Sequence, residues 1–323
     1  MDIITKYITT PTKKRQVPSQ EKTSSNLIVV SKDLVRSLKK AKKKATWDKV
    51  RILGLGNSLA SGWTAIDNNV EPLVNKLRPF IMPFAKEEDL DLELLSYPLA
   101  SQNNNHNIYD FLRTNPSLSD VRKRFEASFD GWKKEFQNTP FENYVDKDVA
   151  MSYYPEGDRR LEDNFSDDIL TFIFFNGSSG LILEKLMAMT KESKIEPLKS
   201  ILTKKGRKEL YQEEIYYLKS IRDYLLSLSD NSILTIGNFP YFNTPLGVFV
   251  NPIISEFNGE IRKAVEGEKT SFYEGMSLSF FEEYGGKIKV DNHPTIDEQY
   301  ASLLGYAEHI NEKVKVLTRA DEN

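Results

Sequence analysis

The stretch that decides the fold is residues 50–64, VRILGLGNSLASGWT. A mostly apolar run from Val50 to Leu55 ends at Gly56-Asn57-Ser58. A buried strand that ends in a glycine-flanked serine is typical of a nucleophile elbow, in which a sharp turn lifts the serine oxygen above the end of the sheet. Glycines beside the serine allow backbone angles that a side chain would forbid. The stretch therefore predicts a strand whose carboxyl end presents Ser58 as a nucleophile.

A serine nucleophile needs a base, and the C-terminal part of the chain supplies a histidine with an acid beside it. Residues 290–295 read VDNHPT, so Asp291 stands two residues before His293. In such a catalytic set the histidine takes the serine proton, and a carboxylate holds the imidazole in orientation. Side chains two residues apart on an extended chain point to the same side. We therefore expect Ser58, His293 and Asp291 to act together.

Two other interpretations of residues 50–64 compete with this one. Gly54-Leu55-Gly56 opens like the G-x-G-x-x-G turn of dinucleotide-binding proteins, but the third glycine position is Leu59, where a small residue is needed. Alternatively, Ser58 is an ordinary helix-capping serine that follows a strand. The distant histidine motif favours the catalytic interpretation over both.

The two motifs together resemble those of the SGNH (GDSL-type) hydrolases. Residues 56–62, GNSLASG, resemble the family's first block, which is usually Gly-Asp-Ser-Leu with a glycine a few residues later, although Asn57 replaces the usual aspartate. Residues 291–294, DNHP, resemble the last block, usually Asp-x-x-His-Pro, with the aspartate one position closer to the histidine. The order and spacing of the blocks extend the resemblance over about residues 48–318.

Asparagine-containing stretches are the candidates for the oxyanion hole. The resemblance implies that a glycine amide of the second block and an asparagine of the third block point at the oxyanion. Residues 102–105, QNNN, stand in the region of the second block, and Asn176 follows a buried strand near the third. We expect the donors to be the Ser58 amide, Asn104, Asn105 and Asn176. Asparagine is also favoured in plain turns, so a purely structural role remains open for each asparagine.

Strands and helices alternate along the chain after the first motif. Apolar spacing predicts a helix over residues 69–84, and strands over 90–97, 168–175 and 232–236. Such alternation predicts an α/β fold with a parallel sheet, whose functional loops follow the carboxyl ends of the strands. The resemblance implies the three-layer α/β/α, flavodoxin-like arrangement of the SGNH hydrolases.

The chain is expected to divide into two parts. Residues 1–47 form a basic N-terminal arm with a short helix, and residues 48–323 form the SGNH-hydrolase-like domain. An insertion at about residues 115–165 is either a packed surface subdomain or a lid over the site. Within the arm, residues 1–28 lack an apolar period and predict an extended segment, and residues 32–45 predict a helix.

Charge is spread unevenly between these parts. Residues 1–44 hold 12 Lys and Arg against 3 Asp and Glu, a net charge of +9, so the remainder carries −12 of the total of −3. A basic arm on an acidic body suits an anionic partner or a larger assembly. The alternative is a solvated helix end, where lysines interact favourably with the helix dipole. No aromatic residues separate the lysines, which argues against binding of single-stranded nucleic acid.

Composition limits the chemistry further. The chain has no cysteine, which excludes disulfides and cysteine catalysis, and its three histidines argue against a multi-histidine zinc site. We expect no cofactor and no metal. The sequence has no apolar run of the ~18 residues that span a membrane and no signal-peptide core, so we expect a cytoplasmic location and no transmembrane segment. His309, on the last predicted helix, is expected to be a surface or partly packed residue.

These observations predict an ester hydrolase of the esterase or lipase type, acting on a small-molecule, lipid or carbohydrate ester. Ser58 would attack the acyl carbonyl and His293 would move the proton. The altered second and third blocks keep another class open, a catalytically weak or inactive SGNH-fold binding or assembly protein. A nucleotide-binding module is a third hypothesis. The acyl and alcohol parts of the substrate depend on pocket shape and are not predicted by the motifs.

Overall fold

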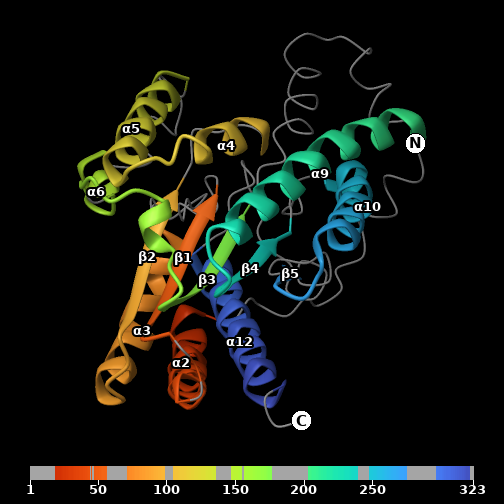
Figure 1. The fold of residues 1–323 in the computed structure, drawn as a ribbon. Coiled ribbons are helices and arrows are strands. Elements are labelled where there is room, and N and C mark those ends of the chain that lie inside the picture. The colour runs from red at the N-terminus through yellow and green to blue at the C-terminus, as the bar shows by residue number, and fades with distance from the viewer. Residues whose placement is uncertain are drawn as a thin grey trace.

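The core of the structure is a parallel sheet whose strands come from widely separated parts of the sequence (Figure 1). The computed structural model describes residues 19–43, 45, 47–56, 71–98, 105–135, 147–154, 156–176, 203–238, 247–274 and 296–320. Within these residues, five strands lie in the spatial order β2-β1-β3-β4-β5, and each neighbouring pair is parallel. The strands are β1 (Lys49–Gly56), β2 (Leu92–Pro98), β3 (Ile169–Asn176), β4 (Ser232–Gly237) and β5 (Thr270–Tyr273). This is the flavodoxin-like order, so the α/β fold prediction is confirmed.

The central strands are buried on both faces. Every residue of β3 is buried, and so is every residue of β1 after Lys49. This explains why both strands read as almost continuous apolar runs rather than as alternating patterns, since helices cover both faces of a parallel sheet.

Helices form the two outer layers, and a hydrophobic cluster joins each layer to the sheet. On one face, α2 (Gln20–Lys42), α3 (Leu73–Glu87) and α12 (Ile296–Ala320) pack on Val50, Ile52 and Phe172. On the other face, α4 (Asn105–Leu112), α5 (Leu118–Glu135), α9 (Lys204–Ser227) and α10 (Gly247–Val265) pack on Leu53 and Ile173. Figure 1 shows the sheet between the two groups of helices, which confirms the three-layer α/β/α arrangement. None of the described helices is long and apolar enough to cross a membrane.

The N-terminal helix differs from its prediction. It begins at Gln20, where the Ser19 side chain accepts a hydrogen bond from the Lys22 backbone N–H, so residues 20–28 are helical rather than extended. Its buried stripe includes Leu27, Leu34, Val35 and Leu38, with Thr23 and Ser31 in the same stripe. The helix packs along α12 and α3. Because Thr23 and Ser31 interrupt the apolar residues of this stripe, its helical period was not recognised in the sequence. The helix is part of the hydrophobic core on one face of the sheet.

The segment that we predicted as an insertion contributes to the other cluster. It contains α5, α6 (Lys147–Ser152) and the short 3₁₀ helix η1 (Glu162–Asn164). Phe125 and Phe129 of α5 are buried, and the ring of Tyr154 stacks on Phe125 with centroids 3.9 Å apart. These rings belong to the same cluster as Leu53 and Ile173, so this part of the segment is packed against the main core.

A partly buried ion cluster lies in the half of the sheet toward the amino ends of the strands. Arg51 is 2% exposed, and its Nε and Nη2 atoms donate to Glu93 Oε2 at 3.0 and 2.8 Å. Arg159 Nη1 donates to Glu93 Oε1 at 2.6 Å. Burial alone would raise the pKa of Glu93, but the hydrogen bonds from Arg159 and Arg51 outweigh it and lower the pKa to about 2. At this end of the sheet, the charges of Arg51, Glu93 and Arg159 are therefore paired with one another.

Candidate functional site

The carboxyl ends of the strands meet at one edge of the sheet. Gly56, the last residue of β1, is paired with Pro98 of β2 on one side and with Asn176 of β3 on the other. Gly237, at the end of β4, pairs with Tyr273 at the end of β5. Ligands of such sheets bind outside the carboxyl ends, in the crevice between β1 and β3, where the strand order reverses. This edge is therefore the candidate site.

Gly56 is required by the geometry of this edge. Its φ angle is +136°, and a Cβ on this residue would lie 2.1 Å from the carbonyl oxygen of Asn176. A side chain cannot be accommodated there, because real Cβ contacts are never so short and because the backbone angle is one that L-residues rarely adopt. The predicted role of the glycine before Asn57-Ser58 is thus consistent with the structure.

The predicted catalytic residues themselves lie outside the described part of the chain. Ser58 is in the segment 57–70, Asn104 is in the segment 99–104, and Asp291 and His293 are in the segment 275–295. Their roles stay predictions. The described residues do establish where these segments join the fold, because β1 ends two residues before Ser58 and α12 begins three residues after His293.

Asn176 lies at the edge itself. It is the last residue of β3 and is 9% exposed, and its Oδ1 atom is buried without a hydrogen-bond partner. Its Nδ2 atom lies beside Gly237, 3.4 Å from where a Cβ on that glycine would stand. A buried amide oxygen without a hydrogen-bond partner is costly, so its position at this edge calls for an explanation. Asn176 is the predicted oxyanion-hole residue that the structure places next to the end of β1.

Asn105 is buried at the start of α4, and it contacts a carboxylate that sequence reasoning missed. Its Nδ2 atom donates to Glu214 Oε2 on α9 at 2.6 Å. This hydrogen bond joins the start of α4 to the middle of α9. Glu214 is 1% exposed and stands in the buried stripe of α9 between Leu210 and Leu218. A charged residue within an apolar helical stripe was the signal that could have identified it.

A second buried charge at the same edge was also missed. Lys76 of α3 is 1% exposed, and its Nζ atom donates to the backbone oxygen of Glu71 at 2.9 Å and to Gln299 Oε1 of α12 at 2.5 Å. Burial raises the pKa of the Glu71 carboxyl, and the positive charge of Lys76 partly offsets that effect. The first turn of α3 packs closely on β1 at this point. A Cβ on Gly54 would lie only 2.7 Å from the Val74 side chain, so only glycine leaves room for this contact.

Another serine–histidine pair occurs away from this edge. His309 Nε2 lies 2.7 Å from Ser271 Oγ, and burial together with the charge of Lys313 lowers the pKa of His309. Ser271 is buried within β5, and its hydroxyl also lies 3.4 Å from that of Thr235 on β4. A buried mid-strand hydroxyl is poorly placed to attack a substrate, so we interpret this pair as a link between α12 and the sheet. His309 is half-buried, as expected for a partly packed residue.

Within the residues that the structure describes, no group of three or more histidine, aspartate or glutamate side chains is placed to hold a metal ion. Among the described residues, the buried polar groups near the carboxyl edge include the amides of Asn105, Asn176 and Gln299, the amine of Lys76, and the carboxyl groups of Glu214 and Glu298. Such groups donate and accept hydrogen bonds around a polar substrate group.

Comparison with known proteins gives a limited result. No protein-family model matches the sequence, and no curated protein matches it. A lipase from a goat rumen metagenome is similar in structure, with 12% sequence identity, a TM-score of 0.45, and coverage of 83% of this chain and 97% of the lipase. An acetyl xylan esterase from the rumen bacterium Butyrivibrio proteoclasticus has 12% identity, a TM-score of 0.37, and coverage of 83% of this chain and 64% of the esterase. These similarities are too low to transfer residues or an activity.

Proposed function

We propose that this protein is a serine ester hydrolase of the SGNH type, with Ser58 as the nucleophile and His293 as the general base. The observation that carries the proposal is the pairing of Gly56 with Asn176. It puts the strand end that leads to Ser58 beside a buried amide, at the point between β1 and β3 where the strand order reverses. A nucleophile and an oxyanion donor are needed together at one place.

The proposed reaction follows from the residue types. Ser58 Oγ attacks the acyl carbonyl carbon while His293 takes the hydroxyl proton, giving a tetrahedral intermediate. His293 then gives this proton to the leaving alcohol as the C–O bond breaks. Water attacks the acyl-enzyme in the second half, with His293 again accepting and returning a proton. Asp291 is the proposed acceptor of the other imidazole N–H.

The negative oxygen of the intermediate needs hydrogen-bond donors. We assign this role to the Asn176 amide and the Ser58 backbone N–H, with Asn104 and Asn105 as further candidates. The Asn105 amide nitrogen already donates a hydrogen bond to Glu214. We therefore prefer Asn176 over Asn105 as the oxyanion donor. A single donor of this kind contributes about 3–4 kcal/mol to transition-state stabilisation.

Turnover of p-nitrophenyl esters graded by acyl-chain length tests the proposal. The wild type should hydrolyse at least one of these esters, and both Ser58→Ala and His293→Ala should lose that activity while keeping their thermal unfolding midpoint. The panel also identifies the preferred acyl length, which the fold does not specify.

The second serine–histidine pair provides the matched control. Ser271→Ala removes a hydroxyl that is 2.7 Å from an imidazole, but at a buried mid-strand position. This variant should keep the ester turnover of the wild type. Loss of activity in Ser271→Ala with full activity in Ser58→Ala would overturn the assignment.

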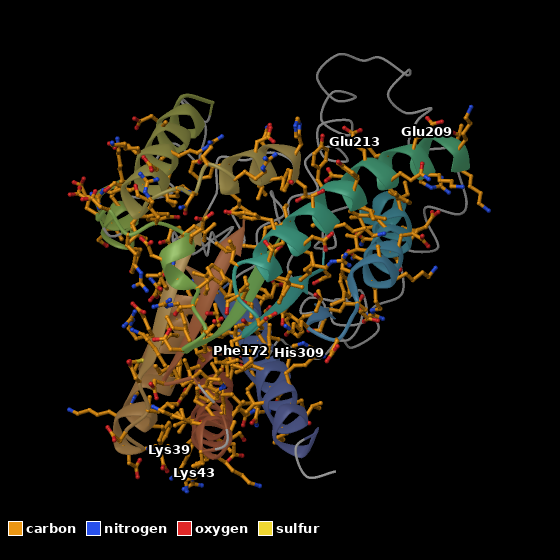
Figure 2. All side chains as sticks on the ribbon, viewed as in Figure 1. Lys39, Lys43, Phe172, Glu209, Glu213 and His309 are labelled. Carbon is orange, nitrogen blue, oxygen red and sulfur yellow. The ribbon has the colours of Figure 1, made fainter. Side chains whose placement is uncertain are left out.

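A second candidate function is binding of an anionic partner through α2. Lys40 and Lys43 are exposed at the C-terminal end of this helix. Figure 2 shows Lys39 and Lys43 at that end, on the opposite side of the molecule from Glu209 and Glu213. Because α2 belongs to the hydrophobic core, this basic surface has a fixed position, and it is separate from the carboxyl edge of the sheet.

A further inference from the structure

Lys76 is a buried cation that the proposed reaction does not use. It stands beside Val74 and Leu77 in the face of α3 that packs toward the sheet, and only 1% of it is exposed. Lysine is almost never buried to this degree unless its ammonium group is well hydrogen-bonded, because desolvating the charge is costly. The hydrogen-bond partners of the Lys76 ammonium group therefore explain how the charge is tolerated at this position.

Two hydrogen bonds donated by Lys76 join parts of the chain that are far apart in sequence. The backbone oxygen of Glu71, 2.9 Å from Nζ, belongs to the residue that directly follows the segment 57–70 containing Ser58. Gln299 Oε1, 2.5 Å from Nζ, belongs to the first turn of α12, six residues after His293. Lys76 Nζ thus contacts one residue that follows the segment with the proposed nucleophile and one residue shortly after the segment with the proposed base.

Other groups also contact the start of α12. The Gln20 backbone N–H donates to Asp297 Oδ1 at 2.7 Å, which ties α2 to the first turn of α12. The rings of Phe80 and Tyr300 meet edge to face, with centroids 6.1 Å apart. These contacts should keep α12 docked on α2 and α3 when Lys76 is replaced, while the hydrogen bonds from Lys76 to Glu71 and to Gln299 are lost.

Lysine suits this task because its ammonium group is a compact charge with several donors on a flexible stem. It meets a backbone carbonyl and a side-chain amide oxygen, neither of which carries a formal charge. Gln299 is itself buried, so its amide is oriented by its surroundings. Lys76 therefore connects the backbone at Glu71 to the side chain of Gln299 through hydrogen bonds of defined direction.

We propose that Lys76 is a positioning residue that fixes the start of α12, and with it His293, relative to the segment that carries Ser58. This inference rests on the proposed function, since it assigns a role within the same site. A displacement of about 1 Å between reacting groups costs on the order of 100-fold in rate. Lys76 acts through the geometry of Ser58 and His293 and does not itself touch the substrate.

The test compares Lys76→Met and Gln299→Met with the wild type in ester turnover. Each variant keeps a side chain of similar length and removes one side of the hydrogen bond. We expect kcat to fall by about 10- to 100-fold while KM changes less than about 3-fold, because binding of the ester does not depend on the alignment of the base. The double variant should be no slower than the slower single variant, since both remove one link.

Arg51→Met is the matched control, because Arg51 is a cation buried to nearly the same degree in the opposite half of the sheet. It should lose stability and keep the kcat of the folded fraction. Hydrogen–deuterium exchange supplies a readout independent of turnover: amides in the first two turns of α12 should exchange faster in Lys76→Met and unchanged in Arg51→Met.

The outcomes separate the two proposals. An active wild type whose kcat is unchanged in folded Lys76→Met and Gln299→Met would overturn the positioning role and leave the hydrolase standing. The same holds if kcat falls equally in Arg51→Met, because the effect would then reflect general loss of stability. A wild type that hydrolyses no ester would overturn the proposed function and this inference with it.

Discussion

The backbone of Gly56 lies so close to that of Asn176 that a Cβ on Gly56 would stand 2.1 Å from the Asn176 carbonyl oxygen. Gly56→Ala should therefore force β1 and β3 apart and also strain a φ angle of +136°. We expect a loss of about 3 kcal/mol in the free energy of unfolding, measured by denaturant titration.

The matched control for this substitution is Gly259→Ala. Gly259 lies within α10, and a Cβ there would meet no atom within 4 Å. Alanine is the better helix former, so this variant should gain about 0.5–1 kcal/mol. Equal effects of the two substitutions would show that the close approach at Gly56 does not constrain the fold.

The second prediction concerns the stability of the protein in acid. The pKa of Glu93 is lowered from its ordinary value of 4.5 to about 2 by Arg159 and Arg51, against the effect of burial. The ionised carboxylate therefore stabilises the folded state above pH 4.5, and this contribution is lost as the pH falls from 4.5 toward 2. Glu93→Gln should cost about 2 kcal/mol at pH 7, allowing for partial solvent screening, and the difference from the wild type should shrink below pH 4.5.

Glu88→Gln serves as the control for Glu93→Gln. Glu88 lies 4.0 Å from Arg36 at the surface, with both side chains more than a third exposed. Exposed pairs of this kind contribute little, so we expect a change below about 0.5 kcal/mol. A wild-type advantage over Glu93→Gln that stays constant from pH 7 to pH 3 would contradict the account of the ion cluster.

The third prediction concerns the basic surface of α2. Deleting residues 1–44 would remove Leu34, Val35 and Leu38 from the core, so charge reversal is the better test. The double variant Lys40→Glu, Lys43→Glu should elute from a heparin column at lower salt than the wild type, with unchanged ester turnover.

Reversal of Lys204 and Lys205 on α9 changes the net charge equally at a different surface and should affect heparin elution less. Wild-type retention that does not weaken with increasing salt would remove the idea of an anionic partner. Equal losses in both double variants would point to net charge alone.

The fourth prediction concerns the acid of the proposed triad. If Asp291 accepts the N–H of His293, Asp291→Asn should lower kcat by roughly 10⁴ and change KM little, because the imidazole loses its orienting carboxylate. Single-turnover and steady-state assays measure this effect. Nearly full activity in Asp291→Asn, with His293→Ala inactive, would refute Asp291 as the acid and indicate a Ser–His dyad.

Much of the fold could be predicted because its strands are apolar runs and its helices have periodic faces. The run before Asn176 predicted β3 within one residue, and the alternation of elements predicted the parallel sheet. The start of α2 could not be predicted in this way, since Thr23 and Ser31 occupy its buried stripe and interrupt the apolar period. The structure supplies their packing partners, which the sequence pattern does not contain.

For the candidate site, the position of Asn176 at the carboxyl edge could be predicted from the sequence, whereas the buried residues around the edge could not; the roles of Ser58, Asp291 and His293 stay predictions. The expectation that the carboxyl edge holds Asn176 next to the strand before Ser58 follows from motif order and parallel topology. Lys76 and Glu214 escaped prediction because a charged residue in an amphipathic helix normally faces solvent. Their burial depends on Gln299 and Asn105, which lie far away in the sequence.

Labelling with a fluorophosphonate probe tests the central claim most directly, because the probe forms a covalent adduct only with an activated serine. We predict one adduct per wild-type chain, mapped by peptide mass spectrometry to the peptide containing Ser58, and no adduct in Ser58→Ala. An adduct at Ser271 or any other serine, or an unlabelled wild type, would contradict the assignment of Ser58 as the nucleophile.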